Sequence, residues 1–370
     1  MKKIKLADAC CINMGQSPVS SSYNAEQRGI PFFQGNADFG DLNPRVRLWC
    51  DEPTKIANPG DLLLSVRAPI GALNIANCTC CIGRGLAALT ANPAVCDSSW
   101  LYFALKSKVT ELQAQGTGST FKAINKTALQ NLPLPNCQLS EQKKIAKILQ
   151  KVCSLISTRQ QQLAKLDQLA KSRFIEMFGS SLNDTNYPII KLNQLSIKIS
   201  DGVHAKPDYQ STGMPFLSVV NIVRGFVDFT NCKYVSKEAY EKMIRSTNPQ
   251  KGDVLYTKVG ATYGIPAYVD TEQKFCLYVS VCLIKPNHAQ INSKFLAFSM
   301  GMPYIKKQAD ARIKGIGVPD LHLNQIREFD IITPPRVLQN EFAAFVEQLD
   351  KSKVICNKLY KEVEFLQFRM

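Results

Sequence analysis

The chain has 370 residues, of which 45% are hydrophobic and 20% are charged. This composition is typical of a globular protein and excludes an intrinsically disordered one, and the length allows two or three domains with buried cores. The 45 lysines and arginines outnumber the 30 acidic residues, so the net charge of +15 indicates a phosphate-rich partner. A solvated basic surface without a partner is the alternative.

The sequence also argues against a membrane protein and against a secreted one. The longest apolar run, Phe275 to Ile284, is far shorter than the roughly 20 residues that span a bilayer. A polar stretch follows the basic residues Met1 to Lys5, so no signal peptide is predicted. The 13 cysteines show no framework of even spacings, which favours free thiols and a location in the reducing cytoplasm.

In chain order, the sequence predicts a first block over residues 1–138, a long helix with a linker over 139–183, a second block over 184–335 and a closing helix over 336–370. The two blocks repeat each other in sequence. The matching motifs are Gly29-Ile30-Pro31-Phe32-Phe33 with Gly213-Met214-Pro215-Phe216-Leu217, and Gly60-Asp61-Leu62 with Gly252-Asp253-Val254. A period near 190 residues is that of a duplicated domain followed by a helix, rather than that of a solenoid of short repeats.

Each block is predicted to be a mixed α/β domain, so the fold class is α+β. The segments Asp61–Val66 and Asp253–Thr257 read as short buried strands, and we interpret their aspartates as turn residues. Phe275–Ile284 is β-branched and aromatic without a breaker, which predicts one central strand. Long loops such as Gln34–Asn43 are where recognition is expected.

A long helix follows each block. Between Ser140 and Phe178, and again from Arg336 to Met370, apolar residues recur about every 3.5 residues, which is the period of a coiled-coil seam. Neither run contains proline or glycine, so each is predicted to be one helix about 50 Å long at ~1.5 Å per residue. Gln339-Asn340-Glu341 looks like a degenerate copy of the Glu141-Gln142 start of the first helix.

Catalytic, metal-binding and cofactor motifs are not evident. The sequence has no phosphate-binding P-loop, and its three histidines stand in no recognisable triad. Cys78-Thr79-Cys80-Cys81 contains a C-x-x-C spacing, but a structural zinc needs a second pair of ligands, so buried thiols are favoured. The chain is expected to hold no cofactor and to present surfaces rather than break bonds.

Taken together, the blocks, helices and basic charge resemble the specificity (HsdS) subunits of type I restriction–modification systems, over the whole chain. The motifs that carry the resemblance are Gly29–Gly35, Gly60–Gly71, Ile82–Ala87 and Gly118–Phe121 in the first block, and Asp201–His204, Pro207–Tyr209, Gly213–Leu217, Asn221-Ile222 and Gly252–Leu255 in the second. Each motif is weak alone, but their order, occurring twice, is specific.

The resemblance implies a non-catalytic subunit in which each block is a target-recognition domain that reads one half of a split double-stranded DNA site. It implies that the two helices form an antiparallel coiled coil whose length sets the gap between the half-sites. It also implies methyltransferase subunits as partners, two of them expected, and restriction subunits as further partners. The S-adenosylmethionine would be held by the methyltransferase.

Base reading uses side chains with paired donors or acceptors. On that ground, and because they lie in or beside the family motifs, we predict a set of DNA-contacting residues, with Lys206 and Lys314 as phosphate contacts. The predicted residues are Gln34, Arg67, Arg84 and Lys122 in the first block, and His204, Lys206, Tyr209, Asn221, Lys258 and Lys314 in the second. For Arg67 the alternative is a salt bridge at a strand end.

Two other functions remain open from the sequence. A stand-alone nuclease with duplicated DNA-binding domains would cleave DNA with magnesium and no partner. A coiled-coil scaffold without DNA would bind no duplex, and its positive charge would be incidental.

Overall fold

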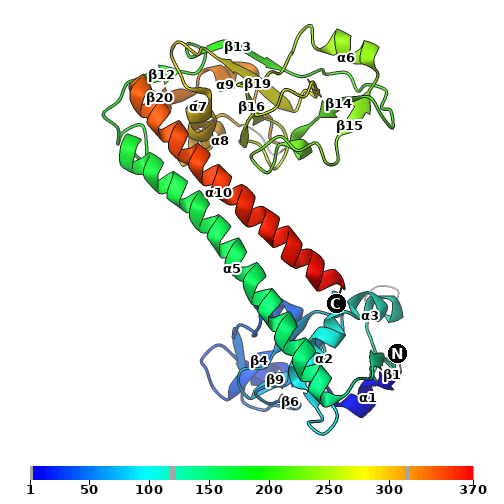
Figure 1. Cartoon of the computed structure of the whole chain (residues 1–370). Helices are drawn as coiled ribbons and strands as arrows, with labels where there is room; N and C mark the ends of the chain where they lie inside the picture. Colours follow the sequence, from blue (N-terminus) through cyan, green and yellow to red (C-terminus); the bar gives the residue numbers. More distant parts are fainter. Residues whose placement is uncertain (1–2, 117–121, 314–316, 370) are drawn as a thin grey trace. The chain divides into compact units, whose positions relative to one another are not determined.

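The computed structural model describes residues 3–116, 122–313 and 317–369, with side chains as far as Val354 and at Cys356. The chain forms two compact units (Figure 1). Unit 1 comprises Met1–Ser157 with Val363–Met370, and unit 2 comprises Thr158–Glu362. None of the described helices is both long enough and apolar enough to cross a membrane.

Unit 1 is built from short strands with a few short helices. Its strands are β1 (Lys3–Lys5), β2 (Cys10–Met14), β3 (Tyr23–Asn24), β4 (Ile30–Phe33), β5 (Leu48–Cys50), β6 (Ile56–Ala57), β7 (Leu62–Ser65), β8 (Leu73–Ile75), β9 (Cys80–Ile82), β10 (Leu86–Ala91) and β11 (Pro133–Pro135). Its helices are α1 (Leu6–Ala9), η1 (Ser20–Ser22), η2 (Asn36–Asp38), α2 (Ser98–Lys106), α3 (Val109–Gln115) and α4 (Lys126–Gln130). The sheets have the orders β1-β11, β2-β10-β7-β8 and β3-β5-β4-β9-β6.

Unit 2 has a similar inventory. Its strands are β12 (Ile189–Lys191), β13 (Ser196–Asp201), β14 (Met214–Leu217), β15 (Lys233–Val235), β16 (Val254–Thr257), β17 (Pro266–Tyr268), β18 (Cys276–Leu277), β19 (Val281–Pro286) and β20 (Asp330–Ile332). Its short helices are η3 (Val219–Asn221), α6 (Lys237–Met243), α7 (Ser293–Met300), α8 (Pro303–Arg312) and α9 (Leu323–Arg327). The sheets have the orders β12-β20, β13-β19-β16-β17 and β15-β14-β18.

The two units repeat one topology. The antiparallel sheet β2-β10-β7-β8 corresponds strand for strand to β13-β19-β16-β17. The parallel pair β4–β9 corresponds to the parallel pair β14–β18. The repeated motifs occupy equivalent strands, because β4 and β14 follow the Gly29 and Gly213 turns while β7 and β16 follow the Gly-Asp pairs. The predicted duplication of a mixed α/β domain is therefore confirmed.

One predicted strand is wrong. The run Phe275–Ile284 is not a single strand: it forms β18 and then, after a turn at Val279 and Ser280, β19, and these two strands belong to different sheets. In unit 1 the same turn is the Gly83-Arg84-Gly85 segment. The turn in unit 2 contains no glycine or proline, so composition alone hid it.

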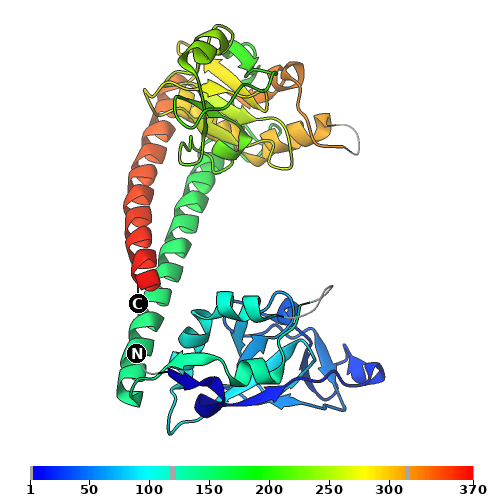
Figure 2. The same ribbon diagram turned by 90° about the vertical axis from the view of Figure 1, so that its right-hand side faces the viewer.

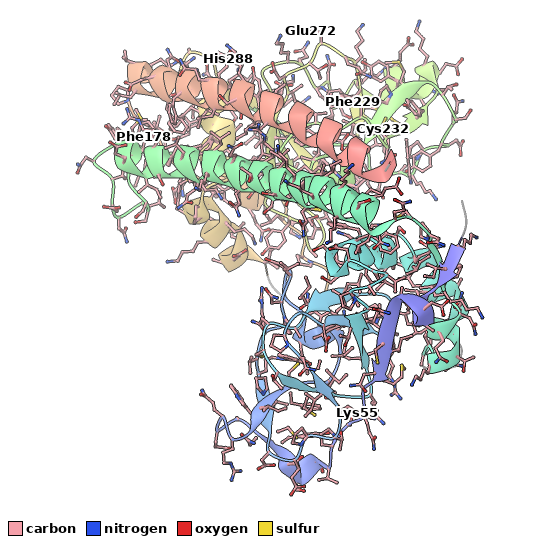
Figure 3. All side chains as sticks on the ribbon, turned by 60° about the horizontal axis from the view of Figure 1, so that its bottom comes forward. Lys55, Phe178, Phe229, Cys232, Glu272 and His288 are labelled. Carbon is pink, nitrogen blue, oxygen red and sulfur yellow. The ribbon has the colours of Figure 1, made fainter. Side chains whose placement is uncertain are left out.

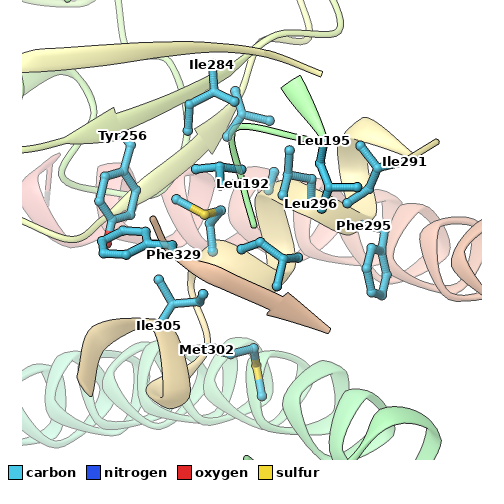
Figure 4. Packing of buried hydrophobic residues seen from close by; sticks show 14 of the residues in the cluster. Leu192, Leu195, Tyr256, Ile284, Ile291, Phe295, Leu296, Met302, Ile305 and Phe329 are labelled. Atoms are coloured by element: carbon cyan, nitrogen blue, oxygen red, sulfur yellow. The ribbon is translucent and has the colours of Figure 1, made fainter. Parts of the chain in front are cut away.

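The turn role of the two aspartates is confirmed. Asp61 Oδ2 accepts a hydrogen bond from Asn58 N at 2.8 Å, and Asp253 Oδ2 accepts one from Gln250 N at the same distance. Both carboxylates thus fix the turn that leads into β7 or β16. Behind these strands lie the apolar cores; Figure 4 shows the one in unit 2, where residues such as Leu192, Tyr256 and Phe329 pack together.

The predicted long helices are α5 (Leu139–Phe178) and α10 (Arg336–Arg369). Within unit 2 they lie side by side and run antiparallel (Figures 1 and 2). The direction follows from the contacts, since the residue number falls along α10 as it rises along α5. These contacts are Gln162 with Cys356 (3.8 Å), Asp167 with Lys353 (2.8 Å) and Arg173 with Glu341 (3.2 Å).

Within unit 2, an aromatic cluster packs the end of α5 against α7 and α10. The ring of Phe174 is fully buried and contacts the rings of four other phenylalanines. Those residues are Phe178 on α5, Phe295 and Phe298 on α7, and Phe342 on α10. Figure 3 marks one member of the cluster, Phe178, at the end of α5.

A buried glutamine anchors the start of each long helix to its domain. Gln142 Oε1 accepts a bond from Asp97 N at 2.8 Å, and its Nε2 donates to the carbonyls of Val95 and Cys137. Gln339 repeats this arrangement with Asn292 N at 2.8 Å and the carbonyls of Gln290 and Pro334. The start of α10 therefore keeps the anchoring glutamine of α5, although the residues around it have diverged.

We expect Gln339→Ala to lower the free energy of unfolding of unit 2 by about 1–3 kcal/mol, because the part-buried Asn292 N–H and the buried Pro334 carbonyl both lose their partner. Asn340→Ala is the matched control: it is the next residue, and it loses only an exposed bond from Asn292 Nδ2. Urea unfolding followed by circular dichroism measures both. Equal losses in the two variants would show that the buried amide has no special role.

Candidate nucleic-acid interface

In unit 1, several loops meet at one edge of the four-stranded sheet. We call this the loop edge of unit 1; it consists of residues 15–17, 34–38, 65–67, 83–85 and 122–124. Backbone hydrogen bonds join these segments to one another and to the sheet. They are Gln16 N to Ile82 O (3.0 Å), Gly83 N to Phe33 O (2.8 Å), Val66 N to Gly85 O (2.9 Å) and Ile124 N to Val66 O (2.9 Å). Backbone contacts thus hold the loops in place without using the side chains of Gln34, Arg67, Arg84 or Lys122.

All the predicted contact residues of the first block lie on this edge. Gln34, Arg67, Arg84 and Lys122 are each exposed to solvent. Arg67 forms no ion pair with a described residue, so the salt-bridge alternative finds no support in this part of the chain. The structure brings together four side chains that are up to 88 positions apart in sequence.

The glycine after Arg84 is required by close packing. A Cβ atom at Gly85 would lie 2.4 Å from the carbonyl oxygen of Gln34, a distance that backbone atoms cannot accommodate. The turn therefore presses against the Gln34 segment and holds Arg84 at its tip. Arg84 N donates to Ser17 Oγ at 3.3 Å, which adds the neighbouring loop to the same support.

Unit 2 has an equivalent loop edge, formed by residues 201–204, 218–221, 257–260, 278–280 and 319–321. Its backbone bonds match those of unit 1 one for one. They are Val203 N to Leu277 O (2.9 Å), Tyr278 N to Leu217 O (2.9 Å), Lys258 N to Ser280 O (3.0 Å) and Leu321 N to Lys258 O (2.9 Å). The same scaffold therefore presents different side chains in the two units.

The predicted residues of the second block differ in exposure. His204 is 78% exposed and lies 3.6 Å from Asp201. The Lys258 side chain is only 6% exposed, and its Nζ lies 3.5 Å from Asp201 and 3.6 Å from Asp320. Lys258 thus ties two loops to the end of β16, and its burial favours a positioning role over a base contact.

Asn221 is also buried. Its Oδ1 accepts from Ser218 N at 3.0 Å and its Nδ2 donates to the Asp228 carbonyl at 3.0 Å, so both ends of the amide are engaged within the loop. A side chain used in this way supports the loop rather than reading bases. Its predicted DNA contact would require these bonds to break.

Lys206 and Tyr209 lie on an exposed loop beyond His204. The centroid of the Tyr209 ring lies 5.8 Å from that of Phe216. Lys233, on β15, places its Nζ 4.1 Å from the centroid of the Tyr209 ring. Lys206 Nζ is 5.9 Å from the same ring. The two lysines place positive charge around one aromatic side chain, as cation–π contacts do. Sequence reasoning missed Lys233, which lies at the exposed start of β15. Lys314 lies outside the described residues.

A second missed residue is Arg47 in unit 1. It pairs with the buried Asp38, whose carboxylate also holds the backbone of the Gln34 segment. The available signal was the alternation Arg45-Val46-Arg47 just before β5, in a loop next to the Gly29–Gly35 motif.

The cysteines add no reactive site to either edge. None of the 13 cysteines, all of which lie in the described ranges, forms a disulfide bond, and burial raises the pKa of Cys80 and of Cys282 to about 12, so both of these thiols stay protonated near neutral pH. Across the described ranges, no group of three or more His, Cys, Asp or Glu side chains could hold a metal ion.

Two copies of one domain, each with a loop edge built on the same backbone hydrogen bonds and each followed by a long helix, define a duplicated protein whose two edges carry different side chains. Residues 1–168 and 182–364 match the family described as "Type I restriction modification DNA specificity domain". The chain belongs to this family. The predicted resemblance is confirmed, and the match gives no support to the nuclease alternative.

Individual relatives agree with the family. A Methanocaldococcus jannaschii protein, assigned provisionally as the MjaX type I restriction enzyme specificity subunit, is 41% identical over 160 residues, which is 43% of this chain and 38% of that protein. The MjaIX specificity subunit of the same organism is 23% identical over 82% of this chain and 74% of its own. The first match thus spans less than half of the relative.

A solved structure confirms the predicted fold. The type I restriction–modification S subunit from M. genitalium covers 100% of this chain and 94% of its own, with a TM-score of 0.61 and 17% identity. At this identity the likeness concerns the fold alone. Two mixed α/β domains with long helices are therefore common to both proteins.

Proposed function

We propose that the chain is the DNA-specificity subunit of a type I restriction–modification system and that it has no catalytic activity itself. Each unit reads one half of a split target in double-stranded DNA. The observation that carries this proposal is the pair of equivalent loop edges, which share a backbone network but present different exposed side chains. One scaffold with two sets of side chains is what reading two different half-sites requires.

The proposal extends to partners. Two methyltransferase subunits would bring the S-adenosylmethionine, and restriction subunits would complete a restriction complex; the relatives named above are specificity subunits of such enzymes. Leu169 and Ile175 on α5 are about half exposed, which supports this helix as a docking surface. A cytoplasmic location follows from the proposed role, because the cellular DNA is the substrate.

Methylome sequencing tests the proposal. A host with this gene and its methyltransferase is expected to carry N6-methyladenine at a motif of two short half-sites around a fixed gap, and deletion of the gene is expected to abolish that methylation. An uninterrupted palindrome, or methylation independent of the gene, would contradict the proposal.

Duplex binding gives a second readout. If the complex contacts six to ten phosphates, its affinity is expected to fall by about 10³–10⁵ between roughly 50 and 200 mM salt, because counterions are released on binding. Cleavage of DNA by the purified chain with magnesium alone would favour a nuclease. Absence of binding to the methylated motif, with the methyltransferase present, would favour a scaffold without DNA.

A further inference from the structure

One arginine beside the loop edge of unit 1, Arg47, is held by a buried acid of that edge, Asp38. Arg47 Nε donates to Asp38 Oδ1 at 2.9 Å, and Arg47 Nη2 contacts the same oxygen. The Asp38 side chain is 7% exposed, whereas the Arg47 side chain is 60% exposed. The exposed guanidinium of Arg47 is therefore anchored on its Nε side by the buried carboxylate of Asp38.

The carboxylate is itself fixed by the backbone. Asp38 Oδ2 accepts hydrogen bonds from Gln34 N at 2.8 Å and from Gly35 N at 3.3 Å. One side chain thus sets the path of the Gln34 segment and the direction of Arg47. Because Asp38 bonds to both, Arg47 is held next to Gln34, which is a predicted base contact.

The anchoring leaves the outer edge of the guanidinium available. Arg47 Nη1 donates to no described residue, and Nη2 carries a second N–H. A planar pair of donors in a fixed direction suits the O6 and N7 acceptors that guanine presents in the major groove. A phosphate contact needs only a mobile positive charge, and it would gain little from a buried carboxylate that neutralises part of that charge.

We infer that Arg47 reads a guanine in the half-site bound by unit 1, with Asp38 as the residue that positions it; this inference rests on the proposed function. Unit 2 does not repeat this pair at the equivalent position, although its Arg224 Nη1 lies 3.5 Å from Asp228 Oδ2 in the corresponding loop. The equivalent of Asp38 in unit 2 is Asn221, a neutral side chain whose contacts are Ser218 N and the Asp228 carbonyl. The guanine that Arg47 reads therefore lies in the half-site bound by unit 1.

The first experiment compares the methylated motifs of wild type, Arg47→Ala, Arg47→Lys and Arg45→Ala, each expressed as the full chain with its methyltransferase. Arg47→Ala is expected to fold, because Asp38 keeps its two backbone donors. In both Arg47 variants we expect one position of one half-site, a guanine in the wild-type motif, to accept other bases as well. Lysine keeps the positive charge but lacks the planar pair of N–H donors. Arg45→Ala removes the same charge two residues away and is expected to leave the motif unchanged.

The second experiment uses duplexes of the wild-type motif in which that guanine is replaced by 7-deazaguanine, which lacks N7 but still pairs with cytosine. Wild-type complex is expected to bind this duplex about three- to tenfold more weakly than the natural one. The Arg47→Ala complex is expected to bind the two duplexes equally, because its contact to N7 is already absent.

The alternative outcomes are distinct. If Arg47→Ala binds every duplex more weakly by the same factor and keeps the motif, Arg47 is a phosphate contact and the inference is overturned. If Arg47→Ala does not fold, Arg47→Lys decides between the same two results. If the wild-type complex gives no split motif at all, the proposed function fails, which is a different result from an unchanged motif in the variants.

Discussion

Replacing Phe174 by alanine is expected to lower the free energy of unfolding of unit 2 by about 3–5 kcal/mol, the usual cost of a large cavity in a packed core. The Phe174 ring is fully buried, and its centroid lies between 5.1 and 5.8 Å from those of four other phenylalanine rings. Those rings come from α5, α7 and α10. The cavity would therefore loosen the attachment of both long helices to the domain, and urea unfolding followed by circular dichroism measures the loss.

The neighbouring residue provides the control. Ile175 is 43% exposed on the same helix, so Ile175→Ala removes apolar atoms that were only partly shielded from water. We expect it to cost about 1 kcal/mol or less. Similar losses in the two variants would mean that helix propensity, rather than the aromatic cluster, dominates the stability at this end of α5.

The features that sequence predicted well depend on local, repeated patterns. The long helices were evident because apolar spacing and the lack of proline and glycine act over some 40 residues, and α5 covers Leu139–Phe178 as expected. The duplication was evident because its turns need glycine: Gly29 and Gly213 both have positive φ. Helix periodicity and turn glycines are local requirements, so they can be recognised in the sequence at the positions where they act.

What sequence could not predict depends on contacts between distant segments. The turn at Val279 and Ser280 has no local signal, and only its pairing with neighbouring loops reveals it. Lys258 was predicted to contact DNA as a lysine next to a motif, but its surroundings include Asp320, 62 positions away. Burial of a charged side chain depends on whether such partners reach it.

Removing one heptad from each long helix is expected to shorten the gap in the DNA target while leaving both half-site sequences unchanged. The segments to delete are residues 158–164 of α5 and 354–360 of α10, which contain the contacting residues Gln162 and Cys356. A heptad preserves the phase of the seam, and the anchors at Gln142, Phe174 and Gln339 all remain. The domains should therefore keep their folds and their loop edges.

The size of the change follows from two repeat distances. Seven helical residues span about 10 Å at ~1.5 Å each. B-DNA rises about 3.4 Å per base pair, so the gap should shrink by up to about three base pairs. A change of three base pairs also rotates one half-site by roughly 100° around the duplex, given about 10 base pairs per turn, so we expect weaker binding to accompany the shorter gap.

Methylome sequencing of the deletion variant, alongside Gln161→Ala as a control that alters the same segment without changing its length, distinguishes the outcomes. A shorter gap with intact half-sites in the deletion variant, and an unchanged motif in the control, would establish the helices as the element that sets the spacing. Altered half-site sequences would show that the helices shape the loop edges instead. Helices that are two turns shorter cannot hold the attached domains at the original separation. An unchanged gap would therefore mean that something other than helix length fixes the distance between the half-sites.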